Sequence, residues 1–511
     1  MKDYKILKNS YYDSVTLMST TVTIKKDLGL KDLVMFMGTE MNKDMIKSVG
    51  LYHADMDHAE PNDLILATEF EGEREGWADD VVNRLSSRKK TESKTDKTYK
   101  TIHQATQDHE ANIAIISVPG IYAAHEAYKA LEEGLHVMLF SDNVSVEDEI
   151  YLKDYALKKD LLVMGPDCGT AIINGKGLCF ANQVKKGPIG LVAASGTGLQ
   201  EVTVIIDRFE GGITQAIGVG GRDLSEKVGG RMMLKGIDAL DADEETKVIV
   251  LISKPPHHSV YEKIMARLKQ VTKPVVVCLL DQKSEETLPN VYFVSTLTEA
   301  ATKALSLINL KTPELTLVDQ ELKQLLDQEK ANYTKGQNKI KGLFCGGTLT
   351  AEALSVIRPK VDHITSNVAK KEKEKMHDPL VSDGHNLVDL GDDIFTQGKP
   401  HPMIEPTIRN DRILQEAKNP ETAVILLDFE LGLGSHEDPV GVTLDAIKEA
   451  QKLAQKEGRY LSFVGYVCGT SQDFQGLDYA ETRLKESGVL VAKTNAHAAL
   501  IAAELVQGGK R

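Results

Sequence analysis

Two short stretches of this sequence place glycines next to hydroxyl side chains, where an apolar run gives way to a helical pattern. The first is Ser-Gly-Thr-Gly at residues 195–198, and the second is Gly-Gly-Thr at residues 346–348. A strand that turns on glycines into a helix exposes unpaired N–H groups and the positive end of the helix dipole. Such a turn suits a phosphate or a carboxylate, but the same residues also occur in ordinary βα turns, where they only cap the helix.

The second stretch repeats the first. Each has Gly-Leu at the start of the apolar run, Gly-Thr at the turn, and a glutamate four residues after that threonine, at Glu201 and Glu352. One strand-glycine-helix turn is weak evidence of a site, whereas the same arrangement twice in one chain is stronger. Two helix N-termini could point at a single anion, and we expect the two turns to converge.

Other segments follow predicted strands at the carboxyl end, where open α/β sheets bind ligands. Asp167, in the segment Gly165-Pro-Asp-Cys-Gly169, could face a ligand or cap the turn, and Cys168 is expected to be a small buried residue. Gly220 and Gly221 resemble an anion-binding nest or allow a tight turn. We take Asp167, Gly220 and Gly221 as ligand-facing candidates.

Several histidines also follow predicted strands. His436 lies in a glycine-rich segment after the run that ends at Asp428, and we take both residues as candidate catalytic groups. His401, between two prolines, could hold a carboxylate, but a role in stabilising a turn is favoured. The pair at 257–258 is interpreted as exposed loop histidines.

The composition limits the class of protein. A chain of 511 residues is too long for one core, and 41% hydrophobic with 27% charged residues describes a globular protein. A net charge of −14 disfavours nucleic acid and anionic membranes as partners. Five cysteines without a C-x-x-C pair indicate reduced thiols in a cytoplasmic protein, and no metal site is expected.

Strand-like and helix-like runs alternate along the chain, which predicts an α/β fold with parallel sheets. We expect a Rossmann-like domain over residues 1–186, with about five strands that include residues 33–37, 64–67 and 113–118. A second domain over 187–309 and a third over 340–511 each begin with one of the glycine turns. Residues 310–339 are expected to be a helix-prone linker.

These motifs resemble a known family. Gly165-Pro-Asp-Cys-Gly, the segment 187–197 and the segment 216–221 are similar to the alpha subunit of succinyl-CoA synthetase, in the same order. The region from Gly342 through residues 387–391 and 423–428 is similar to the carboxyl-terminal domain of its beta subunit. The fused arrangement resembles the FdrA family, which implies two flavodoxin-like domains of the CoA-ligase type after the Rossmann-like domain.

In the synthetase superfamily the two turns begin the "power helices", which stabilise a phosphohistidine. By this resemblance, phosphate would be held by Ser195, Gly196, Thr197, Gly198, Gly346, Gly347 and Thr348. Two features depart from the pattern. Residues 281–291 contain no carrier histidine, and the turn at 37–43 has a single glycine where a glycine-rich coenzyme A loop is expected. Coenzyme A binding is therefore doubtful, and no cofactor is firmly implied.

The FdrA resemblance also implies a function. That family is associated with allantoin breakdown and, with two partner proteins, with oxamate carbamoyltransferase activity. The reaction converts oxalurate and phosphate to oxamate and carbamoyl phosphate, and it needs no histidine carrier if phosphate attacks the carbamoyl carbon directly. The alternatives are an NDP-forming acyl-CoA synthetase-like protein that lacks the phosphohistidine, and a non-catalytic scaffold subunit.

Overall fold

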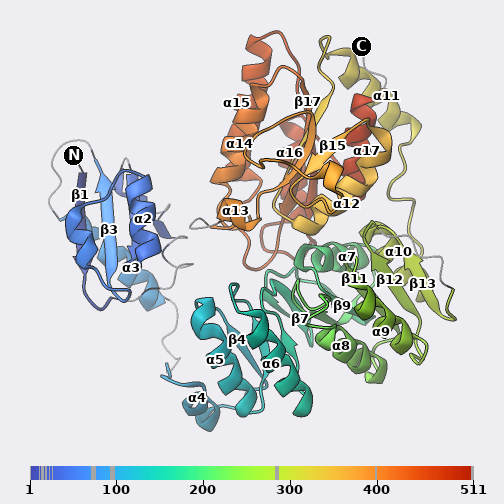
Figure 1. The fold of residues 1–511 in the computed structure, drawn as a ribbon. Helices are drawn as coiled ribbons and strands as arrows, with labels where there is room; N and C mark the ends of the chain where they lie inside the picture. The colour runs from blue at the N-terminus through green and yellow to red at the C-terminus, as the bar shows by residue number, and fades with distance from the viewer. Residues whose placement is uncertain are drawn as a thin grey trace. The chain divides into compact units, whose positions relative to one another are not determined.

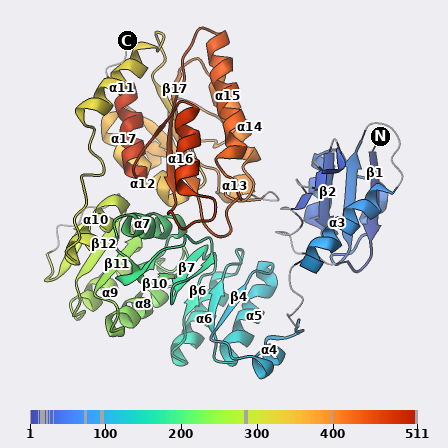
Figure 2. The same cartoon turned by 180° about the vertical axis from the view of Figure 1, so that it is seen from behind.

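The computed structural model describes residues 2–10, 12, 17, 20–21, 24–25, 27–30, 32–70, 76–91, 98–281, 287–396 and 400–507. The chain forms two compact units (Figures 1 and 2). The first comprises residues 1–99 and 393–400, and the second comprises residues 100–392 and 401–511. None of the helices in the described part of the chain is long and apolar enough to cross a membrane.

The first unit is built on an antiparallel sheet in the order β1-β3-β2. The strands are β1 (Lys2–Leu7), β2 (Asp32–Met37) and β3 (Leu64–Glu69). Two helices follow strands of this sheet, α2 (Glu40–Ser48) and α3 (Trp77–Thr91). The central strand β3 is buried on both faces: Leu64 and Leu66 pack in one hydrophobic cluster, and Ile65 and Ala67 pack in another.

The prediction of one five-stranded Rossmann-like sheet over residues 1–186 is wrong for the first unit. The runs at 33–37 and 64–67 are β2 and β3, which pair antiparallel with each other. The later runs form a separate parallel sheet, β4-β5-β6, of β4 (Ile113–Ile116), β5 (His136–Leu139) and β6 (Val163–Met164). A strand buried on both faces is apolar throughout whether its neighbours are parallel or antiparallel, so the pattern alone could not separate the two cases.

The small parallel sheet is accompanied by three helices. They are α4 (Ile102–Asp108), α5 (Gly120–Glu132) and α6 (Val146–Lys158). Ser145 caps α6 by accepting a hydrogen bond from the backbone of Asp148. The loop after β6 leads into a hairpin of β7 (Thr170–Ile173) and β8 (Lys176–Cys179), which the sequence analysis did not predict.

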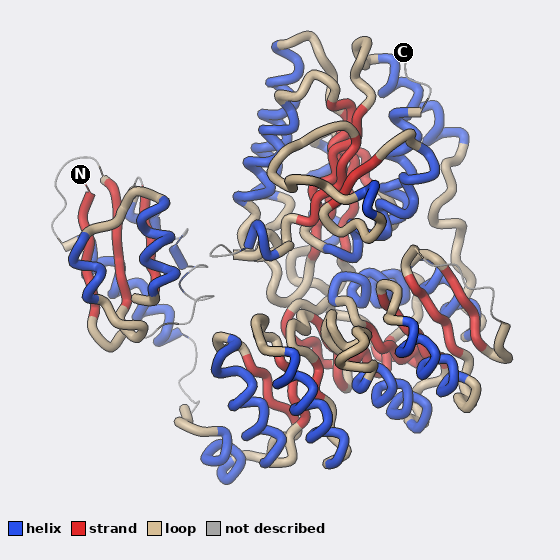
Figure 3. Tube along the Cα trace, viewed as in Figure 1, coloured by secondary structure: helices blue, strands red, loops and turns tan. Residues whose placement is uncertain are grey.

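That hairpin extends the second parallel sheet, whose order is β13-β12-β11-β9-β10-β7-β8. Its parallel strands are β9 (Lys186–Ala193), β10 (Ile213–Gly218), β11 (Val248–Ser253), β12 (Val275–Leu279) and β13 (Val291–Val294). The helices are α7 (Gly196–Arg208), α8 (Arg231–Ala242), α9 (His258–Leu268) and α10 (Leu297–Leu307). Figure 3 shows helices flanking these strands.

The third sheet is also parallel, in the order β15-β16-β14-β17-β18-β19. Its strands are β14 (Lys339–Phe344), β15 (Ile364–Ser366), β16 (His385–Asp389), β17 (Thr422–Glu430), β18 (Ser462–Cys468) and β19 (Val489–Val491). The helices include α12 (Gly347–Ile357), α14 (Thr407–Ala417), α15 (Gly441–Lys456), α16 (Leu477–Glu486) and α17 (Asn495–Val506). The α/β fold with parallel sheets is confirmed.

The segment expected as a linker contains helix α11 (Gln320–Ala331), which packs against α17. Its Leu326 is buried in the hydrophobic cluster that the second and third sheets share. That cluster also holds Leu199 of α7 and Leu349 of α12. The two sheets are therefore joined by a continuous core, and α7 and α12 lie at the junction between them (Figure 1).

Two buried glutamates tie the domains together at this junction. Glu352 of α12 accepts a hydrogen bond from the backbone of Leu297, the first residue of α10, at 2.6 Å. Glu201 of α7 accepts one from the backbone of Asn495, the first residue of α17, at 3.1 Å. Each glutamate thus satisfies an unpaired N–H group at the start of the other domain's last helix. Burial and the nearby Glu201 raise the pKa of Glu352 to about 8.

The Asn495 side chain completes this junction, which allows a test. It donates to Glu352 at 2.8 Å and to the carbonyl of Leu349 at 2.9 Å. Asn495→Ala should lower the free energy of unfolding by about 1–3 kcal/mol, because both acceptors lose a buried donor. Urea unfolding measures the change. The control is Asn332→Ala, whose exposed side chain donates to Gln328, and it should shift stability by less than about 0.5 kcal/mol. Equal stability of the two variants would contradict this account of the junction.

Candidate functional site

The two glycine turns lie in direct contact. The Oγ of Ser195 and the Oγ1 of Thr348 are 2.6 Å apart and share a hydrogen bond. A Cβ added to Gly346 would lie 3.0 Å from the Oγ1 of Thr197, so the glycine permits the close approach. The structure therefore brings together the N-termini of α7 and α12, which begin 151 residues apart at Gly196 and Gly347.

The local sequence explains how each helix begins. Ser195 is the N-cap of α7, and its Oγ accepts a hydrogen bond from the N–H of Gly198 at 3.0 Å. Gly346 occupies the same position for α12, where no side chain caps the helix. Ser195 therefore caps α7, which is the role that these residues have in ordinary βα turns.

Asp428 supports the turn before α12. It lies in β17, the neighbour of β14, and its two carboxylate oxygens accept hydrogen bonds from the N–H groups of Cys345 at 2.8 Å and Gly346 at 3.1 Å. Asp428 therefore positions the glycine turn, and it is not free to contact a ligand as the sequence analysis expected of a catalytic candidate. Its role could be inferred only from the register of β14 and β17.

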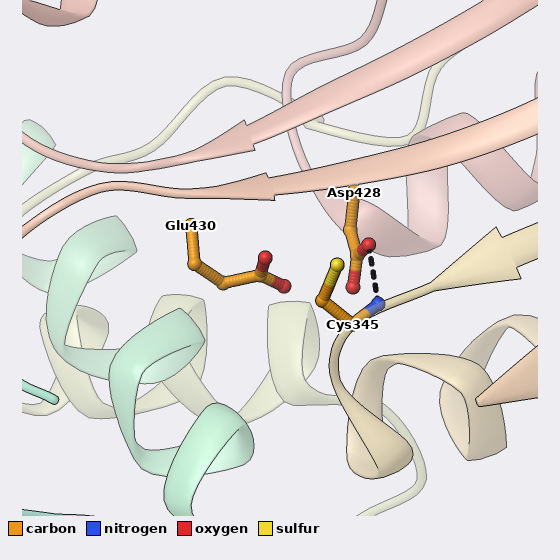
Figure 4. A group of neighbouring side chains, drawn as sticks. All are labelled: Cys345, Asp428 and Glu430. Carbon is orange, nitrogen blue, oxygen red and sulfur yellow. Dashed lines mark hydrogen bonds between the residues drawn. The ribbon is translucent and has the colours of Figure 1, made fainter. Parts of the chain in front are cut away.

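A second carboxyl and a guanidinium surround Asp428. Glu430 points toward Asp428 and Cys345 (Figure 4), and burial raises the pKa of both carboxyls. Arg409 of α14 donates to the Sγ of Cys345 at 2.9 Å and to the carbonyl of Asp428 at 2.6 Å. Burial also raises the pKa of the Cys345 thiol. The group is close to neutral when Asp428 is ionised against Arg409 and Glu430 keeps its proton.

The same group has atoms that could bind a metal ion. Among the described residues, one oxygen or sulfur each from Cys345, Asp428 and Glu430 lies within 4.8 Å of the others. Two observations oppose a dication here: the oxygens of Asp428 already accept two N–H groups, and the guanidinium of Arg409 contacts the sulfur. The donor set fits an arginine counter-ion better than a metal ion.

A cavity of about 150 Å³ opens beside the first turn of α7. It is lined by three predicted ligand-facing residues, Asp167, Gly220 and Gly221, and by Ser195 and Gly196. The volume exceeds the space that one water molecule needs. Cys168 also lines it but is buried, and burial raises the pKa of its thiol to about 12. The structure thus gathers these five candidates around one space, whereas Thr197 and Gly198 do not line it.

Asp389 lies on another side of the N-terminus of α12, and the sequence analysis missed it as a site residue. It is the last residue of β16, and its Oδ1 accepts a hydrogen bond from the N–H of Gly391 at 2.9 Å. A Cβ added to Gly347 would overlap its Oδ2 and would lie 3.9 Å from the Nζ of Lys254. Burial raises the pKa of Asp389 to about 7. The apolar Leu390 that follows Asp389 makes the run of residues 386–390 look continuous, which hid the carboxyl-end position of Asp389.

The histidine candidates have local roles. The Nδ1 of His436 accepts a hydrogen bond from the N–H of Asp438 at 2.9 Å, so this side chain stabilises its own loop. The Nδ1 of His401 accepts from the N–H of Met403 at 3.2 Å, in agreement with the turn role that we favoured. Burial lowers the pKa of His401 to about 4. His257 is exposed and caps α9.

The turn at 37–43 belongs to the first unit and follows β2 of the antiparallel sheet, with Thr39 as the N-cap of α2. The comparison of this turn with a coenzyme A loop is therefore wrong, because the turn does not follow a strand of the parallel sheet β4-β5-β6. Residues 282–286, part of the segment where the carrier histidine was sought, lie outside the described residues.

The support that Asp428 gives to the turn can be tested. Asp428→Asn keeps the shape but replaces one acceptor oxygen with an N–H₂ group that faces a backbone donor. We expect the free energy of unfolding to fall by about 1–3 kcal/mol in urea titrations. The control is Asp411→Asn, on the exposed surface of α14. A variant as stable as this control would show that the carboxylate does not hold the turn.

Three families of known proteins match parts of this chain. The family described as "CoA-ligase" matches residues 343–505, and the family described as "CoA binding domain" matches residues 184–279. The family described as "AllF, heavy metal-associated domain" matches residues 1–104. All five cysteines come after residue 167, so this last segment lacks the thiolates that soft metal ions prefer.

Individual relatives extend the comparison. The alpha subunit of the ADP-forming succinate–CoA ligase of Aquifex aeolicus is 30% identical over 183 residues, which span 35% of this chain and 59% of that subunit. The apo structure of the dinucleotide-forming acetyl-coenzyme A synthetase 1 of Ca. Korarchaeum cryptofilum aligns with 81% of this chain and 86% of that chain, at 15% identity and a TM-score of 0.35. The protein YahF of Escherichia coli K12 is 44% identical over 509 residues, 99% of this chain and 98% of YahF. With an AllF-type first domain, a CoA-binding domain, a CoA-ligase domain and this full-length relative, the chain belongs to the FdrA family.

Proposed function

We propose that this chain is a subunit of a carbamoyl-transferring enzyme that converts oxalurate and phosphate to oxamate and carbamoyl phosphate. The observation that supports the proposal most is the contact of the N-termini of α7 and α12 beside a cavity, in a chain without the carrier histidine. Two positive helix ends favour a phosphate and the charge that develops on the attacked carbonyl.

The chemistry is balanced without a cofactor. An oxygen of hydrogen phosphate forms a bond to the carbamoyl carbon, and the bond from that carbon to the imide nitrogen breaks. The proton of phosphate passes to the leaving nitrogen, which gives the amide of oxamate. Both substrates are anions, so the site must offset their repulsion, which fixed N–H dipoles do without moving during the reaction.

The partner proteins are part of the proposal. We propose that two partner proteins complete the enzyme, as the FdrA resemblance implies, and that coenzyme A has no part in the reaction. The five cysteines are free thiols in the structure, which fits a reducing cytoplasm. The small-molecule partners are then phosphate, carbamoyl phosphate and the two carboxylate substrates.

The NDP-forming acyl-CoA synthetase-like alternative is favoured by the matches to the CoA-ligase and CoA-binding families. A synthetase of that type carries phosphate on a histidine. No histidine occurs between residues 259 and 362, the stretch that includes the position of the carrier. This absence is why we rank carbamoyl transfer first.

The proposed phosphate site can be tested with isosteric variants in the complete complex. Thr197→Val and Thr348→Val should each weaken phosphate or carbamoyl phosphate binding by about 1–3 kcal/mol, because each removes a hydroxyl at the junction of α7 and α12. The double variant should lose less than the sum, because both hydroxyls contact one ligand. Calorimetry measures the affinities, with Thr302→Val on α10 as the control. Additive losses, or losses no larger than in the control, would argue for two unrelated caps.

Phosphate labelling distinguishes the proposed carbamoyltransferase from the synthetase-like alternative. Incubation of the protein with ATP and magnesium, with or without coenzyme A, should leave no acid-labile phosphate on it, because the carrier histidine is missing. Radiolabelled ATP followed by acid and base treatment distinguishes phosphohistidine from phosphoserine. Stoichiometric acid-labile label would support the synthetase and contradict the carbamoyltransferase proposal.

A further inference from the structure

The proposed reaction moves one proton, from phosphate to the leaving nitrogen, and the hydroxyls of the two turns do not readily accept it. General acid–base groups work best when both protonation states are populated near the working pH. A carboxyl that serves this reaction must lie beside the helix ends, keep one oxygen available and be held rigidly.

Asp428 and Glu430 do not meet these conditions. Both oxygens of Asp428 accept backbone N–H groups of the turn. Glu430 is only 2% exposed and lies behind the turn, against Asp428 and Cys345 (Figure 4). Asp428 could not exchange a proton with a substrate without releasing the turn before α12, and Glu430 is almost fully buried.

Asp389 meets them. Its backbone is held on both sides by Asn367, which accepts from the N–H of Asp389 and donates to its carbonyl, each at 2.9 Å. Its Oδ1 is fixed by Gly391, while its Oδ2 lies against Gly347 in the first turn of α12. The residue as a whole is 9% exposed, so the carboxyl is held in largely buried surroundings.

Charged groups from several elements surround Asp389. Lys254, which follows β11 in the other ligase-type domain, places its Nζ near the same glycine and favours the ionised form. Asp392 and Asp428 favour the protonated form, and the neutral His401 lies beside Gly391. Lys370 is close enough to Lys254 for the two positive charges to interact. Lys254 thus places a positive charge near this carboxyl, where a carboxylate substrate could bind.

We infer that Asp389 is the general acid–base group of the site, and that it carries the proton between phosphate and the substrate nitrogen. This inference rests on the proposed function. In the forward direction the Asp389 carboxylate accepts the proton of hydrogen phosphate as the new C–O bond forms, and it donates that proton to the nitrogen as the C–N bond breaks. In reverse it takes a proton from the amide of oxamate and returns it to the departing phosphate. Burial raises its pKa to about 7, so both forms are populated near neutral pH.

The experiment uses the full chain with its partner proteins and follows oxamate and carbamoyl phosphate as substrates. This direction avoids inorganic phosphate as a substrate, which itself titrates near neutral pH. Asp389→Asn should lower kcat by about 10²–10⁴-fold. Its KM for carbamoyl phosphate should change by less than about threefold, since the variant keeps the shape of the site. Asp389→Glu should restore part of the activity.

The pH profile separates a chemical role from a structural one. Oxamate must give up a proton, so the reverse reaction needs ionised Asp389, and kcat of the wild-type complex should fall as the pH drops below about 7. The residual activity of Asp389→Asn should not show this fall of kcat at low pH. The control is Asp383→Asn, exposed just before the amino end of the same strand, which should keep wild-type rates and the fall of kcat at low pH.

The outcomes distinguish this inference from the proposed function. If the wild-type complex transfers no carbamoyl group, the proposed function is wrong and the role of Asp389 falls with it. If the wild type is active and folded Asp389→Asn keeps its rate or its fall of kcat at low pH, only the inference is overturned. Size-exclusion chromatography would show whether Asp389→Asn fails to assemble. In that case the pH profile of Asp389→Glu tests the inference: the fall of kcat at low pH should move to a different pH if Asp389 carries the proton, and it should stay in place if the residue is only structural.

Discussion

The structure depends on holding the N-termini of two helices together. The hydrogen bond between Ser195 and Thr348 joins these two helix ends. Each helix end carries about half a positive charge, so two opposed ends repel each other when nothing lies between or behind them. Carboxyl groups close to these ends offset that repulsion. Asp428 binds the two N–H groups before α12, and Asp389 lies against its first residue, so the carboxyl groups at this helix end come from strands β17 and β16.

The junction is also symmetric in its connections. Glu201 of α7 caps α17 in the third domain, and Glu352 of α12 caps α10 in the second. Residues that repeat along the sequence therefore repeat their roles in space, each serving the opposite domain. This exchange explains why a glutamate follows each glycine turn at the same distance, although a helix that packed within one domain would have no need of a buried acid there.

Features that depend on neighbouring residues were predictable from the sequence, and features that depend on distant pairing were not. The glycine turns, the strands before them and the α/β class follow from local patterns of apolar residues and turn formers. The antiparallel pairing of β2 with β3 does not, because a fully buried strand looks the same in either kind of sheet. The roles of Asp428 and Asp389 were also hidden, since each depends on which strand lies beside β14.

The direct bond between the two hydroxyls bears on where a phosphate could enter. Ser195 already accepts the N–H of Gly198 and is bonded to Thr348, so an anion that lay between the helices would have to replace the bond between these side chains. The cavity lined by Ser195, Gly196 and Gly220 offers space beside the end of α7, whereas Asp389 and Lys254 lie beside the end of α12. Each of these spaces adjoins the N-terminus of a helix, whose positive dipole end favours a bound anion.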